Sequence, residues 1–256
     1  MNAPVPAGTA GPVEAAFPDA PLLQASQVVK RFAGVTALHG AGLTLAAGEV
    51  LGLIGPNGSG KTTLVNCLSG VLPIDSGEIR LKGRIVTRTS RVGRARLGIA
   101  RTFQNLKLFG DLTVRENVLV GRNASRSRSR DRDAVEDLLA DLHLIGLARE
   151  VVSSLPYGHQ RRVEIARALA GDPDVLLLDE PAAGLNDGET AELRDLLHRV
   201  RRERGCGIVL IDHDMNLVLG VSDRVQVLDE GRVIYNGSPQ GAFKQPAVVE
   251  AYLGSK

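Results

Sequence analysis

A glycine-rich segment follows a short apolar run and precedes a stretch that is typical of a helix. It spans residues 55–62 and reads Gly-Pro-Asn-Gly-Ser-Gly-Lys-Thr. Glycines let successive backbone N–H groups turn toward an anion, and the N-terminus of the following helix adds a partial positive charge. In such a P-loop the lysine reaches the β- and γ-phosphates of a nucleoside triphosphate, and the next hydroxyl can ligate Mg²⁺. The predicted nucleotide-binding residues of this loop are Gly55, Pro56, Asn57, Gly58, Ser59, Gly60, Lys61, Thr62 and Thr63.

An Asp-Glu pair at the end of an apolar run supplies groups that triphosphate hydrolysis requires. Asp179 ends a predicted parallel strand, at the sheet edge where the P-loop also lies, and is the candidate Mg²⁺ carboxylate. Glu180 beside it is the candidate general base. Gln104 could reach the metal and the attacking water, and His213, after a second apolar strand, could donate to the γ-phosphate. The predicted catalytic residues are Lys61, Gln104, Glu180 and His213, and the predicted metal-site residues are Thr62, Gln104 and Asp179.

One aromatic residue is a candidate for binding the base of the nucleotide. Phe32 precedes the P-loop in a chain of which only 3% is aromatic, and its ring could stack on adenine. A phenylalanine on a strand that simply packs into the core is the alternative.

Composition limits the class of protein. A chain of 256 residues with 43% hydrophobic residues can bury a substantial core without disulfides, and its two cysteines fit a reducing compartment. The net charge of +2 argues against a nucleic-acid binder, and the locally basic run 122–132 is interpreted as a solvated segment. No apolar stretch approaches the ~20 residues that span a bilayer, and no secretory leader is evident. We therefore expect a cytosolic protein that reaches a membrane only through partners.

The chain is predicted to be one α/β domain behind a tail. Residues 1–21, crowded with Pro, Ala and Gly, are predicted to be disordered, and residues 22–256 to form the domain. Its N-terminal part is rich in short strands. A polar, Arg-rich middle, about residues 88–152, has helical periodicity and is predicted to be an inserted helical subdomain. The short strands expected in the N-terminal part are residues 22–25, 28–29 and 43–45, with a hairpin around Gly83.

The second half alternates between strands and helices. The apolar runs 174–179 and 207–212 have no polar interruption, which favours a parallel sheet covered on both faces. Between them Asn186 can cap a helix together with Glu189, and Gly205 can end it.

Residues 155–169 carry a more specific pattern. They read Leu-Pro-Tyr-Gly-His-Gln-Arg-Arg-Val-Glu-Ile-Ala-Arg-Ala-Leu, which resembles the signature motif and following helix of an ABC transporter ATP-binding subunit. The resemblance covers about residues 22–254 and implies a P-loop NTPase core of the ABC ATPase type, with an N-terminal antiparallel β subdomain. It also implies that two subunits close head to tail, so that each ATP lies between one P-loop and the partner's signature. The signature residues expected to bind the partner's ATP are Leu155, Pro156, Tyr157, Gly158, His159 and Gln160.

By the same resemblance, Gln104 is the Q-loop glutamine, His213 the switch histidine and Leu185-Asn186 the D-loop. Two departures from the family pattern stand out. Pro156 and Tyr157 replace the usual Ser-Gly, which removes a hydroxyl and a backbone donor from the signature. Asn186 stands where Asp is commoner, which removes a charge but keeps an acceptor.

The sequence Leu-Pro-Tyr-Gly-x-Gln-Arg-Arg resembles one branch of the family, the ATPases of branched-chain amino-acid importers. The further stretches that resemble this branch are residues 98–106, 112–118, 181–186 and 249–254. The branch implies ATP and Mg²⁺ as cofactors, and as partners transmembrane permease subunits and a second ABC ATPase, in a homodimer or heterodimer. A periplasmic binding protein would act indirectly, and no nucleic acid would bind. The chain would lie on the inner face of a bacterial plasma membrane.

The same residues bear on three other functions. ATPases of lipopolysaccharide export share the Glu-Ile-Ala-Arg-Ala-Leu helix but keep Ser-Gly-Gly in the signature, so Pro156 and Tyr157 disfavour export. Soluble ABC proteins that act on DNA or ribosomes usually carry tandem cassettes or long coiled-coil insertions, and this chain shows neither. The signature motif also argues against a P-loop kinase or GTPase.

Overall fold

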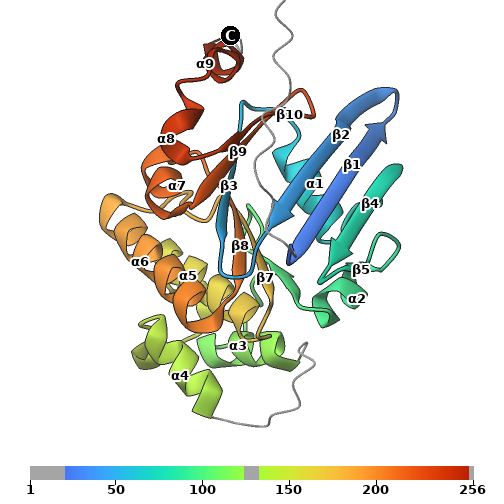
Figure 1. Cartoon of the computed structure of the whole chain (residues 1–256). Helices are drawn as coiled ribbons and strands as arrows, with labels where there is room; N and C mark the ends of the chain where they lie inside the picture. Colours follow the sequence, from blue (N-terminus) through green and yellow to red (C-terminus); the bar gives the residue numbers. More distant parts are fainter. Residues whose placement is uncertain (1–20, 124–132, 254–256) are drawn as a thin grey trace, which may run out of the picture.

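The computed structural model describes residues 21–123 and 133–253 (Figure 1). Apart from Pro21, the predicted tail lies outside these residues, and so does most of the basic run 122–132. The described residues form two sheets with helices around them.

An antiparallel sheet of four strands, in the order β2-β1-β4-β5, forms the N-terminal part. Its strands are β1 (Leu23–Phe32), β2 (Val35–Leu45), β4 (Ser76–Leu81) and β5 (Arg84–Ile85). The β4–β5 hairpin around Gly83 has the predicted position. The runs predicted as separate strands at 22–25 and 28–29 belong to one strand, β1, which continues through a bulge where Gln27 takes a left-handed φ of 51°.

The central sheet has six strands in the order β10-β9-β3-β8-β7-β6. The pairs β9-β3, β3-β8, β8-β7 and β7-β6 are parallel, and β10 pairs with β9 antiparallel. Its strands are β3 (Val50–Ile54), β6 (Ile99–Arg101), β7 (Val175–Asp179), β8 (Gly207–Ile211), β9 (Arg224–Asp229) and β10 (Arg232–Gly237). Every residue of β3, β7 and β8 is buried, which for β7 and β8 confirms the prediction from the uninterrupted apolar runs 174–179 and 207–212.

Alternate residues of the central strands face two different cores. On β7, Leu176 and Leu178 belong to a core shared with the helices α3 (Val114–Asn123), α4 (Asp133–Asp141), α5 (Tyr157–Leu169), α6 (Asp187–Arg204) and α7 (Met215–Val221). Val175 and Leu177 belong to a core shared with α1 (Lys61–Leu68) and the antiparallel sheet. This alternation follows from the period of two in an extended strand. The central sheet is therefore the middle of three layers, which Figure 1 shows with α5 and α6 on one side and α1 with β1 and β2 on the other.

Helices cover both faces of the central sheet and extend beyond it. The helices are α1 (Lys61–Leu68), α2 (Arg91–Arg96), α3 (Val114–Asn123), α4 (Asp133–Asp141), α5 (Tyr157–Leu169), α6 (Asp187–Arg204), α7 (Met215–Val221), α8 (Pro239–Ala242) and α9 (Pro246–Leu253), with 3-10 turns at η1 (Ile145–Leu147) and η2 (Val152–Ser154). The range proposed for the helical subdomain, about residues 88–152, contains α2, α3 and α4 but also β6, a strand of the central sheet.

The longest helix, α6, has the ends that its sequence predicts. The Asn186 side chain accepts from the Glu189 amide, and the Glu189 carboxylate accepts from the Asn186 amide, both at 3.0 Å. Gly205 ends the helix in the left-handed conformation, with φ of 60°.

Both cysteines are buried and free. Cys67 lies on α1, and burial raises the pKa of its thiol to about 11. Cys206 precedes β8, and burial raises the pKa of its thiol to about 12.

The crossing of α3 and α5 gives a test of the fold. A Cβ on Gly121 of α3 would lie 2.0 Å from the backbone oxygen of Arg167 on α5. Alanine improves helix propensity by ~1 kcal/mol, but relieving this overlap requires the helices to separate, at about 1–3 kcal/mol. We expect Gly121→Ala to lower the Tm measured by circular dichroism, whereas Gly146→Ala, with nothing within 4 Å of its added Cβ, leaves the Tm unchanged. Equal Tm values for the two variants would contradict the close crossing.

Candidate active site

The P-loop follows β3 and leads directly into α1. Gly55 has φ of 147°, and a Cβ there would lie 2.0 Å from the Leu228 oxygen, so only glycine fits. Gly60 caps α1 with φ of 104°. No side chain caps the helix, so its first amides stay available to an anion at its N-terminus.

Lys61 is held inside this loop. Its Nζ donates to the carbonyls of Gly55 and Pro56, both at 2.8 Å. Burial lowers the pKa of the Lys61 ammonium, and the charges of Glu180 and Asp179 act in the opposite direction. Because loop carbonyls hold the ammonium, it is placed where a phosphate bound by the loop would lie. Thr62 is exposed at the start of α1.

Asp179 has one carboxylate oxygen with no partner. The residue is 2% exposed, and its Oδ2 lies 3.4 Å from an Arg101 guanidinium nitrogen, whereas its buried Oδ1 has no hydrogen-bond donor. Burial raises the pKa of this carboxyl, opposed by Arg101. A buried, unpaired carboxylate oxygen at the strand end next to the P-loop fits a divalent cation, which prefers oxygen ligands.

Three predicted catalytic residues meet in direct hydrogen bonds. The Gln104 amide Nε2 donates to Glu180 Oε2 at 3.0 Å, and His213 Nε2 lies 3.1 Å from Glu180 Oε1. They follow β6, β7 and β8, which are neighbours in the sheet, so their carboxyl ends bring the three residues to one edge. Glu180 has a left-handed φ of 52°, which non-glycine residues rarely adopt, and its N–H donates to the Ile211 carbonyl at 2.8 Å.

Two site residues were missed by the sequence reasoning. Arg101 donates to Asn66 Oδ1 at 2.6 Å on α1 and lies over the Phe103 ring at 4.4 Å, so it joins the P-loop helix to the end of β6. Asp212 is buried and accepts from the Ala182 and Asp214 amides at 2.8 and 2.9 Å, which fixes the segment after Glu180. The signal available in the sequence was position: Arg101 lies three residues before Gln104, and Asp212 lies directly before His213.

The signature residues lie at the start of α5, whose buried residues belong to the core on the opposite face of the central sheet from α1. Leu155 and Gly158 are buried, whereas Pro156 and Tyr157 are exposed. Gln160 Nε2 donates to the Leu155 carbonyl at 2.8 Å, which closes the first turn. His159 is partly buried, and its Nδ1 has no hydrogen-bond partner.

Phe32 lies at the end of β1 and is 42% exposed. The Nζ of Lys30 lies 5.3 Å from its ring centroid. Phe32 is therefore outside the core, and its ring is accessible to a ligand.

The P-loop and the Glu180 carboxylate, which is hydrogen-bonded to Gln104 and His213, lie at one edge of a parallel sheet. The chain is a nucleotide-binding P-loop ATPase. It belongs to the ABC transporter family, whose profile matches residues 38–183. No helix within residues 21–123 and 133–253 is long and apolar enough to cross a membrane.

Relatives and solved structures agree with this family. The branched-chain amino acid transport ATP-binding protein LivG of Escherichia coli (strain K12) is 40% identical over 250 residues, covering 91% of this chain and 98% of LivG. The lipopolysaccharide export ATP-binding protein LptB of Acidithiobacillus ferridurans is 38% identical over 236 residues, covering 92% and 98%. A crystal structure of an ABC transporter ATP-binding cassette in its ADP conformation matches with a TM-score of 0.82 and 29% identity, over 91% of this chain and 99% of that one.

The geometry around Glu180 predicts separate effects on binding and hydrolysis. Glu180→Gln keeps the size of the side chain but removes the proton acceptor, so we expect ATP hydrolysis to fall by about 10²–10⁴-fold with nucleotide affinity retained. Phosphate release and equilibrium binding of a fluorescent ATP analogue measure the two quantities. Glu203→Gln, an exposed change near the end of α6, is the control and should behave as wild type. Normal turnover of Glu180→Gln would remove Glu180 from the role of base.

Proposed function

We propose that the chain binds Mg²⁺·ATP at the P-loop and hydrolyses it with Glu180 as the general base. The observation that carries this proposal is the position of Glu180, between Gln104 and His213 at the edge where the P-loop lies. A carboxylate oriented by two neighbouring groups can accept the proton of an attacking water in a fixed geometry.

Each remaining group has a part in this proposal. Lys61 exchanges its loop carbonyls for phosphate oxygens, and the His213 Nε2–H can donate to the γ-phosphate. Thr62, Gln104 and the unpaired Oδ1 of Asp179 would hold Mg²⁺, which when bound supplies charge that stabilises the phosphoryl transition state. The protein's own contribution is positioning, since phosphoryl transfer requires little covalent chemistry from side chains.

The complete site is proposed to need two subunits. Within one chain, α1 and α5 lie on opposite faces of the central sheet, so the signature is presented away from the P-loop helix of its own chain. The N-terminus of α5 is suited to a phosphate, because no side chain caps it and the first amides after Pro156 stay available as donors. Pro156 itself supplies no amide. We therefore assign Leu155 to Gln160 to the nucleotide of a partner subunit, either a second copy or a distinct ATPase.

The transport process that we infer is import of branched-chain or related amino acids through a transmembrane permease. The supporting observations are the 40% identity to LivG and the Pro156-Tyr157 signature. The chain would act at the inner face of a bacterial plasma membrane, and a periplasmic binding protein would deliver cargo to the permease. The 38% identity to LptB makes lipopolysaccharide export the alternative to be tested.

The exposed ring of Phe32 leads to a prediction about nucleotide affinity. If Phe32 stacks on adenine, Phe32→Ala removes an aromatic contact of about 1–3 kcal/mol and should weaken ATP binding about tenfold or more. Hydrolysis at saturating ATP should persist, because the phosphate groups are contacted elsewhere. Isothermal titration with a non-hydrolysable ATP analogue gives the affinity. Phe243→Ala, another exposed phenylalanine, is the control, and equal affinities for both variants would contradict stacking by Phe32.

The transport assignment is tested by the partners of the chain. We expect affinity purification of the tagged full chain from gently solubilised native membranes to recover two multi-pass permeases and a second ABC ATPase, identified by mass spectrometry. Recovery of lipopolysaccharide export components would establish the alternative. Recovery of ribosomal or DNA-repair proteins without a membrane partner would overturn transport and leave the ATPase assignment standing.

A further inference from the structure

A buried ion pair binds the helix α5 to the segment that carries Gln104. Arg161 and Glu164 are each 1% exposed and lie 2.8 Å apart. Arg161 donates to the carbonyls of Phe103 and Gln104 at 2.9 and 3.1 Å, and Glu164 accepts from the amides of Phe103 and Lys107 at 3.3 and 3.4 Å. The pair therefore satisfies both donors and acceptors of the Q-loop backbone, which offsets the cost of burying two charges.

Tyr157 extends this pair to the first turn of α5. Its hydroxyl accepts from Nη2 of Arg161 at 3.0 Å, and the Arg161 guanidinium carbon lies 5.7 Å from its ring centroid. The same Nη2 donates to the Gln104 carbonyl. Nη2 of Arg161 therefore links the Tyr157 hydroxyl to the backbone of Gln104, whose side-chain amide donates to Glu180.

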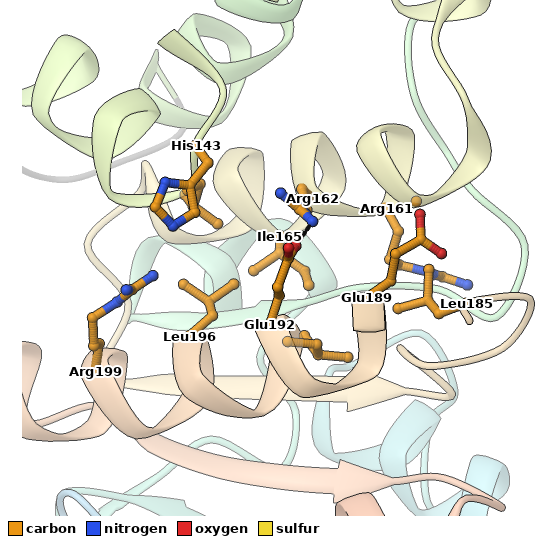
Figure 2. A pocket seen from close by; sticks show the side chains of 12 residues that line it. His143, Arg161, Arg162, Ile165, Leu185, Glu189, Glu192, Leu196 and Arg199 are labelled. Carbon is orange, nitrogen blue, oxygen red and sulfur yellow. Dashed lines mark ion pairs between the residues drawn. The ribbon is translucent and has the colours of Figure 1, made fainter. Parts of the chain in front are cut away.

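The Tyr157 ring also lies close to the segment before the D-loop. A Cβ built on Gly184 would lie 3.1 Å from a ring carbon of Tyr157, which is a tight contact, and the φ of 79° at Gly184 favours glycine. Glu189, at the start of α6, lies close to Gly158, where an added Cβ would be 2.1 Å from its Oε1. Figure 2 shows Arg161, Glu189 and Leu185 gathered at one end of the pocket between α5 and α6.

We propose that Tyr157 is a positioning residue that couples the start of α5 to the Q-loop and the D-loop of its own subunit. The proposal rests on the proposed function, specifically on Gln104 orienting Glu180. A glycine at this position, which is usual in the signature, offers neither the hydroxyl nor the ring. In this chain a displacement of α5 is therefore transmitted to Gln104 through Arg161 and to Gly184 through the Tyr157 ring.

The first test removes the hydroxyl and keeps the ring. In Tyr157→Phe one N–H of the buried Arg161 loses an acceptor, and the Gln104 carbonyl is held less firmly. We expect kcat for ATP hydrolysis by the full chain to fall about tenfold, while binding of a fluorescent ATP analogue is unchanged. The control is Tyr235→Phe on β10, which removes the hydrogen bond that the Tyr235 hydroxyl donates to the Ser238 carbonyl at 2.9 Å and should keep the wild-type kcat. A wild-type kcat for Tyr157→Phe would overturn the proposal.

The second test identifies the route by a double-mutant cycle. If Tyr157 acts through the Q-loop, Tyr157→Phe combined with Gln104→Ala should be no slower than Gln104→Ala alone. Multiplicative losses would overturn the coupling. Tyr157→Ala also removes the ring contact with Gly184, so it should be slower than Tyr157→Phe, and equal rates would overturn the D-loop part.

These outcomes are separable from failure of the proposed function. A wild-type chain without ATPase activity would overturn the proposed function itself. A Gln104→Ala variant with normal kcat would overturn the role of Gln104 and the coupling with it. Thermal unfolding of each variant shows that a lowered kcat belongs to folded protein.

Discussion

The parallel alignment of the central strands is the constraint on which the active site depends. Asp179 at the end of β7 is paired with Ile211 at the end of β8, and Arg101 at the end of β6 is paired with Leu177. The chain therefore leaves these strands at nearly the same level and in the same direction. Residues that are far apart in sequence arrive together without a long loop to carry them, and the P-loop after β3 opens at this edge as well.

Charges buried near this edge form a second layer of organisation. Arg101 at the end of β6 contacts Asn66 on α1 and Asp179 at the end of β7. Arg161 and Glu164 pair with each other on α5, next to the Q-loop. Removing each of these charges from water costs free energy, and the interaction with a specific partner offsets that cost. The two cores on either side of the sheet are by contrast apolar. The polar contacts thus define how the catalytic segments lie, while apolar packing supplies most of the free energy that holds the sheet and helices together.

Local patterns in the sequence predicted much of the fold. The apolar run of β7, the β4–β5 hairpin and the capping box of α6 depend on neighbouring residues, and each was found where its pattern placed it. The continuation of β1 through Gln27 was not predicted, because a bulge depends on pairing with β2 and β4. The P-loop and the Glu180 cluster were predicted from motifs at strand ends. The contacts of Arg161 with a loop 57 to 58 positions away were not, because spacing along a helix does not reveal what a buried guanidinium reaches.

The two native cysteines are expected to react slowly with thiol reagents in the folded protein. Alkylation and disulfide exchange require a thiolate that solvent can reach, and the thiols of Cys67 and Cys206 are both buried and, with pKa values of about 11 and 12, protonated at neutral pH. Neither sulfur is therefore a target for oxidants or maleimides in the folded protein. A single cysteine introduced on the surface of this ATPase would be the preferred site of labelling, with the native thiols left in place.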